Sequence, residues 1–154
     1  MSEPLFDAIR NQDLAGISRL LEAHPDWIKT QDQRGSTPLL LATYYGNKEV
    51  SDLLLQYPQD VNARDASGNT ALMGVCFKGY VEIAQSLIDR GADVNCTNFN
   101  GATALIFAAT FNREEMVRLL LENGADKELR DDSGNRALEH AKLQGLTPLI
   151  ELLS

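Results

Sequence analysis

The sequence has few cysteines, no long hydrophobic run and no N-terminal segment of the secretory type. Its two cysteines, Cys76 and Cys96, cannot make a disulfide framework in a chain of 154 residues, so we interpret them as structural thiols of a reducing compartment. Met1 to Arg10 contains no basic segment followed by an apolar run. No apolar stretch approaches the roughly 20 residues that span a bilayer. We therefore expect a cytoplasmic protein that does not insert into a membrane.

Basic residues are also scarce. The chain has 14 lysines and arginines against 22 aspartates and glutamates, which gives a net charge of -8. This balance disfavours binding to nucleic acid, whose phosphates would be repelled, and docking on an anionic membrane. It favours a protein partner with a basic patch, because complementary charge accelerates encounter. Net charge does not exclude nucleic-acid binding by a local basic strip, and Arg34, Arg64 and Lys78 are the residues that could form one.

Residues that carry chemistry are few and scattered. The two histidines, His24 and His140, lie near opposite ends of the sequence and are not expected to share a metal ion. No Cys-x-x-Cys pair is present, and no histidine lies near Cys76 in sequence. The segments around Gly68 and Gly91 lack the Lys-Ser/Thr that completes a phosphate-binding loop. We expect no catalytic residues, no metal site and no cofactor.

What the sequence does contain is an internal repeat of 33 residues. The positions that recur at this spacing include an Asp or Asn, a glycine, a threonine and several leucines. They are Asp32, Asp65, Asn98 and Asp131; Gly35, Gly68, Gly101 and Gly134; Thr37, Thr70 and Thr103; Leu39, Leu72, Leu105 and Leu138; Leu54, Leu87, Leu120 and Leu153. Agreement at so many positions predicts one domain built from similar units.

Each unit carries the same local signals. An Asp or Asn three residues before a glycine predicts a turn, because its side chain can accept hydrogen bonds from nearby backbone. The following threonine is suited to cap a helix, and Pro38 fits the first helical position. Gly46, Gly79 and Gly145 would end this helix in a left-handed conformation, with Asn112 taking the same place in one unit. A second helix, such as residues 48–56, follows with apolar residues on one face.

These signals divide the chain into five units without a linker. Residues 1–31 are expected to form an N-terminal capping unit, residues 32–64, 65–97 and 98–130 three full repeats, and residues 131–154 a C-terminal capping unit. Terminal units must present a polar outer side to water, because a repeat buries its apolar face only against a neighbour. The leucines of the last helix are expected to pack inward. A dimer contact is the alternative, and a monomer is expected.

The units resemble the ankyrin repeat over essentially the whole chain. Gly35-Ser36-Thr37-Pro38-Leu39 and Gly91-Ala92-Asp93-Val94-Asn95 match its two signatures almost letter for letter. The resemblance implies an all-α solenoid of stacked helix–turn–helix units with β-hairpin or turn fingers along one edge. There are departures: the histidine that usually follows Pro-Leu is absent, Pro25 and Pro58 replace the exit glycines, and Arg136 replaces the capping threonine.

The resemblance also implies a binding surface, because family members generally bind proteins through the fingertips and the concave face made by the first helices. The positions that match are Gln33, Arg34, Ser36, Tyr44, Tyr45, Ala66, Ser67, Asn69, Phe77, Lys78, Phe99, Asn100, Ala102, Thr110 and Phe111. Five of the chain's ten aromatic residues fall among them. Aromatic side chains concentrate interface energy, so we interpret them as hot spots, led by Tyr44, Tyr45 and Phe111.

The alternative is that some of these rings fold back into the groove between helices as core. At the level of function, the sequence predicts a protein-interaction module that acts as an adaptor or an inhibitor and is not an enzyme. A regulatory protein that binds a small molecule in the aromatic groove is the second hypothesis.

Overall fold

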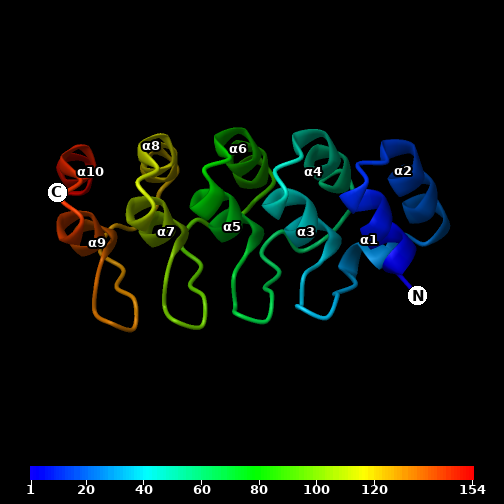
Figure 1. The fold of residues 1–154 in the computed structure, drawn as a ribbon, viewed down its shortest axis with the longest axis horizontal. Helices are drawn as coiled ribbons and strands as arrows, with labels where there is room; N and C mark the ends of the chain where they lie inside the picture. The colour runs from blue at the N-terminus through cyan, green and yellow to red at the C-terminus, as the bar shows by residue number, and fades with distance from the viewer.

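The computed structural model describes all residues, 1–154, as a single file of helix pairs. The helices are α1 (Glu3–Arg10), α2 (Leu14–Ala23), η1 (Pro25–Lys29, a 3₁₀-helix), α3 (Pro38–Tyr44), α4 (Lys48–Leu54), α5 (Ala71–Lys78), α6 (Val81–Asp89), α7 (Ala104–Thr110), α8 (Glu114–Glu122), α9 (Ala137–Leu143) and α10 (Thr147–Leu153). Odd-numbered α-helices form one row and even-numbered α-helices a second row, and loops project from the first (Figure 1). The predicted all-helical solenoid is confirmed, while the unit boundaries stay a prediction.

The first helix of each full repeat begins at the predicted threonine. The side chains of Thr37, Thr70 and Thr103 accept hydrogen bonds from the backbone N–H groups three residues later. Each threonine thereby satisfies one of the N–H groups that a helix start leaves unpaired. In the last unit Arg136 cannot accept such a bond, and Glu139 instead accepts one from the Arg136 N–H at 3.1 Å.

The first helices end as predicted, in a left-handed backbone. Gly46, Gly79 and Gly145 have φ between 66° and 85°, and Asn112 has φ of 56°. Glycine takes this conformation without the steric penalty of a Cβ atom, and asparagine is the usual substitute. The chain then reverses direction, so the second helix of each unit packs back against the first.

The projecting loops are tight turns rather than regular β-hairpins. In the first finger Asp32 N donates to Ser36 O, and the Asp32 carboxylate accepts from the N–H groups of Arg34 and Ser36, each at 2.9 Å. Asp65, Asn98 and Asp131 repeat this pattern. Neighbouring fingers are joined by single backbone bonds, such as Ala66 N to Arg34 O at 3.1 Å. One bond per junction does not make a ladder, so the chain contains no strand.

The exits from the second helices differ where proline replaces glycine. Gly91 and Gly124 have φ of 94° and 90°, whereas Pro25 opens the 3₁₀-helix η1. After α4, which precedes Pro58, the Gln59 amide donates to the carbonyl of Leu54 at 2.6 Å. At the end of α2 a 3₁₀ turn follows, and at the end of α4 the Gln59 side chain bonds a free carbonyl group. In the units with Gly91 and Gly124, the left-handed glycine allows the backbone itself to bond such carbonyl groups.

A continuous core runs between the two rows of helices. Leu105 of α7, Met116 of α8 and Leu149 of α10 are buried in it. The apolar residues of the last helix pack inward: Leu153 is buried, and Leu146, Ile150 and Leu152 are half-buried against the core. No helix combines the length and the apolar character needed to cross a membrane.

Candidate partner-binding surface

Most of the predicted aromatic residues are exposed where the odd-numbered helices end. We call this side, formed by the three fingers at residues 32–36, 65–69 and 98–102 and by helices α3, α5 and α7, the finger-side surface. Tyr44 is 45%, Tyr45 51% and Phe111 43% exposed, and Phe99 at a fingertip is 66% exposed. Phe77 is half-buried. Four of the five aromatic residues predicted as hot spots are therefore exposed to solvent.

A hollow of about 310 Å³ opens in the middle of this surface. It brings together five predicted residues, namely Ser36, Tyr44, Asn69, Phe77 and Phe111. Its other lining residues come from the same helices and turns: Leu40, Leu41, Thr43, Asp65, Thr70, Ala71, Met73, Gly74 and Phe107. We call this site the aromatic hollow. Its apolar wall suits a large apolar side chain, because burial of such a group is worth roughly 1.5–3 kcal/mol.

Contacts among the aromatic residues hold the wall in place. The rings of Phe77 and Phe111 meet edge to face, with centroids 4.6 Å apart and planes at 82°. The Lys78 ammonium lies 4.6 Å from the centroid of the Tyr44 ring. Both arrangements are favourable and restrict the motion of the side chains that form the wall.

Tyr45 does not face the aromatic hollow. With Gln33, Arg34 and Ser36 it lines a second, larger hollow of about 720 Å³ between the first finger and helix α1. Charged side chains of α1, including Asp7 and Arg10, line this second hollow as well. The aromatic residues predicted as hot spots are thus divided between an apolar hollow and a more polar one.

The remaining predicted residues have structural contacts as well. Phe99 covers the neighbouring finger, since a Cβ atom added to Gly68 would lie 2.7 Å from its ring. The backbone groups of Ala66, Ser67 and Asn100 join neighbouring fingers. Ala102 packs against the core. Thr110 is half-buried, and its hydroxyl donates to the carbonyl of Ile106 at 2.7 Å.

Sequence reasoning missed several residues of the aromatic hollow. Leu40, Met73 and Phe107 each lie four residues before a predicted residue, at Tyr44, Phe77 and Phe111. Side chains four residues apart share one face of a helix, so this spacing was the available signal. Leu143, at the same repeat position as Tyr44 and Phe77, was also missed, and it is 76% exposed.

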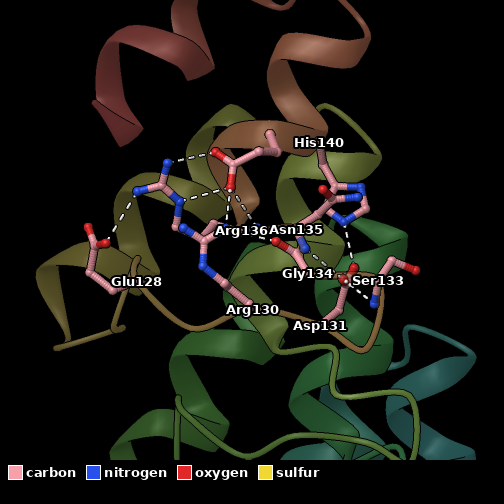
Figure 2. Close-up of polar contacts among 9 residues, drawn as sticks. Glu128, Arg130, Asp131, Ser133, Gly134, Asn135, Arg136 and His140 are labelled. Atoms are coloured by element: carbon pink, nitrogen blue, oxygen red, sulfur yellow. Dashed lines mark hydrogen bonds and ion pairs between the residues drawn. The ribbon is translucent and has the colours of Figure 1, made fainter.

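A polar cluster occupies the finger and first helix of the last unit (Figure 2). The Arg136 guanidinium donates to both Glu139 oxygens at 2.8 Å, and it pairs with Glu128 at 3.2 Å. Nearby, His140 Nε2 lies 2.8 Å from Asp131 Oδ2. Burial alone would raise the pKa of Asp131, but bonds from the Asn135 N–H and His140 hold it below its ordinary value.

The other groups with potential chemistry are isolated from one another. Burial raises the pKa of both cysteine thiols, and the shift is larger for Cys76, which is fully buried. The ring of His24 stacks on Trp27 with centroids 3.9 Å apart. No group of three or more His, Cys, Asp or Glu side chains is placed to hold a metal ion.

Comparison with known families gives one finding. The family model described as ankyrin repeats in three copies matches residues 5–98 and, in a second match, residues 75–154. The two matches together extend from Leu5 to the last residue. No curated protein matches the sequence significantly.

Proposed function

Because the chain belongs to the ankyrin-repeat family, whose repeats generally bind other proteins, we propose that it binds one partner protein through the finger-side surface. It acts as an adaptor, or as an inhibitor that occupies the partner, and it contributes no catalytic group. The observation that carries this proposal is the aromatic hollow, where the side chains of Tyr44 and Phe111 stay 45% and 43% exposed.

The setting of this activity is also part of the proposal. The protein acts as a monomer in the cytoplasm and needs no cofactor. Its net charge of -8 supports a partner with a basic patch, since opposite charges accelerate association. The same charge disfavours nucleic acid and anionic membranes as partners.

Affinity capture with matched variants tests the proposal. We expect the wild-type chain to retain one stoichiometric protein from a lysate of its source cells. Phe111→Ala should weaken this interaction by roughly 2 kcal/mol or more, about 30-fold, if the aromatic hollow is the contact. Tyr45→Ala examines the second hollow in the same way. The matched control is Leu14→Ala, which removes an exposed leucine of α2 away from the fingers.

Each variant should keep the helical circular dichroism of the wild type, because the replaced side chains are exposed. Equal capture by all four proteins would contradict the proposal.

A small-molecule ligand is the second candidate function. The volume of the aromatic hollow, about 310 Å³, lies at the lower end of the range for ligand sites. A metabolite that raises the thermal midpoint of the wild type but not of Phe111→Ala would favour this second function.

A further inference from the structure

The last finger of the chain shows how a finger carboxylate contacts a basic side chain of the following helix. Asp131 Oδ1 closes its turn by accepting from the N–H groups of Ser133 and Asn135, each at 3.0 Å. Asp131 Oδ2 is left for His140, whose Nε2 lies 2.8 Å away (Figure 2). The two carboxylate oxygens therefore make separate contacts: Oδ1 bonds the backbone of the turn, and Oδ2 contacts the His140 side chain of helix α9.

Asp65 makes the same bonds within its turn, but no basic side chain pairs with its second oxygen. Its Oδ1 accepts from the N–H groups of Ser67 and Asn69 at 2.8 and 3.0 Å. The residue nine positions later, which corresponds to His140, is Gly74. No hydrogen bond or ion pair engages Asp65 Oδ2. The space that an imidazole fills in the last unit is thus open beside Asp65, and both Asp65 and Gly74 line the aromatic hollow.

We propose that Asp65 receives a basic side chain of the partner, while a large apolar side chain close to it in the partner's sequence fills the aromatic hollow. This inference rests on the proposed function and adds the chemistry of the partner: a peptide segment that combines Lys, Arg or His with Leu, Met or an aromatic residue. The Asp131–His140 contact within the same chain shows the geometry in which a basic side chain can meet a finger carboxylate.

No basic side chain of this chain pairs with Asp65, so its carboxylate is free to receive one from a partner. Neither Arg34 of the preceding finger nor Arg64, the residue before Asp65, forms an ion pair with it. Lys78 lies over the Tyr44 ring at the far end of α5, about 10 Å along the helix from its first residue at a rise of about 1.5 Å per residue. Asp32, in the preceding finger, is also acidic and unpaired by any cation. A partner's cation is therefore attracted to the finger end of the hollow.

The apolar lining of the hollow explains why the segment should carry an apolar residue as well. Tyr44, Met73, Phe77, Phe107 and Phe111 form an apolar surface that water solvates poorly. A cation bound at Asp65 would be partly shielded from water by this wall and by the partner's apolar side chain. Such shielding strengthens the ionic contact beyond that of a fully exposed pair.

Selection from a phage library of random peptides tests the inference. The bait is the whole chain, as wild type, Asp65→Asn, Gly74→His and Gly74→Ala. Asp65→Asn keeps the turn acceptor, as Asn98 shows in the next finger, and removes only the charge. Gly74→His places an imidazole beside Asp65. A Cβ atom at Gly74 would lie 3.8 Å from Tyr44 Cδ1, an ordinary contact, so the methyl group of alanine fits there, and the imidazole of histidine would extend into the hollow that Gly74 lines.

We expect the wild type and Gly74→Ala to enrich peptides that carry a basic residue close to a large apolar one. Asp65→Asn and Gly74→His should enrich apolar peptides without the basic residue. For one enriched peptide, replacing its Lys or Arg by Gln should raise the Kd for the wild type about fivefold or more, and leave the Kd for Asp65→Asn unchanged.

Two results would overturn the inference. One is enrichment of apolar peptides on the wild type without basic residues, which would leave the proposed function standing. The other is enrichment of no peptide by the wild type, which would exclude a peptide segment as the occupant. In that case the capture experiment with Phe111→Ala decides separately whether the surface binds a folded protein.

Discussion

At the scale of one residue, we expect protonation of the Glu139 carboxylate to destabilise the last helix pair. Its bonds to the Arg136 guanidinium and backbone N–H lower its pKa from an ordinary 4.5 to about 2. A carboxylate with a lowered folded-state pKa adds stability above the unfolded-state pKa and loses it as the pH falls through the folded-state value. The contribution of Glu139 should therefore decrease between about pH 4.5 and about pH 2.

The measurement is denaturant unfolding across this pH range, for the wild type and Glu139→Gln. Glutamine still accepts the Arg136 N–H bond at the helix start, so the variant removes the charge and keeps the cap. We expect the wild type to be the more stable protein near neutral pH and the difference to vanish near pH 2. A difference that is independent of pH would show that the Arg136 pairing does not depend on the charge of Glu139.

At the scale of one helix, the left-handed ending of α7 gives a sharper test because the residue there is not glycine. Asn112 has φ of 56°, whereas the corresponding Gly79 and Gly145 have φ of 85° and 66°. Asn112→Ala should destabilise the protein by about 1 kcal/mol, since alanine adopts the left-handed conformation less readily than asparagine or glycine. Asn112→Gly should be neutral or stabilising by a few tenths of a kcal/mol.

Chemical unfolding of the two variants and the wild type measures both differences. The side chain of Asn112 is exposed and makes no hydrogen bond, so a change in stability reports the backbone conformation alone. Equal stability of Asn112→Ala and Asn112→Gly would contradict a left-handed residue at this position.

The helices were predictable because their starts and ends depend on residues close in sequence. Thr37 caps a helix whose N–H partner lies three residues away, and Asn112 ends one by its own backbone conformation. The aromatic hollow was only half predictable. The repeat position identified Tyr44 and Phe111, and helical spacing could have indicated Phe107. That Asp65 lines the same hollow depends on how the finger packs against the helices, which the spacing does not show. The missing side chain of Gly74 then leaves the space open.

At the scale of the whole molecule, stability is organised by contacts between neighbours. Helix α7 packs against α5, α8 and α9, while α10 at the end of the file packs against α8 and α9. The termini lie at opposite ends and do not approach each other (Figure 1). A stack of this kind has a stability close to the sum of its units and the interfaces between them. A substitution should therefore act over a range set by the position of its unit.

We expect native-state hydrogen exchange to reveal this range. Leu105 and Leu153 are both buried, and Leu→Ala at such a site costs about 2–5 kcal/mol. Leu153→Ala should accelerate exchange in α9 and α10 and leave α3 to α6 nearly unchanged, because those helices do not depend on the last unit. Leu105→Ala should accelerate exchange from α5 to α9, since α7 contributes to interfaces on both sides. Uniform acceleration by both variants would instead mean that the five helix pairs open as one cooperative unit.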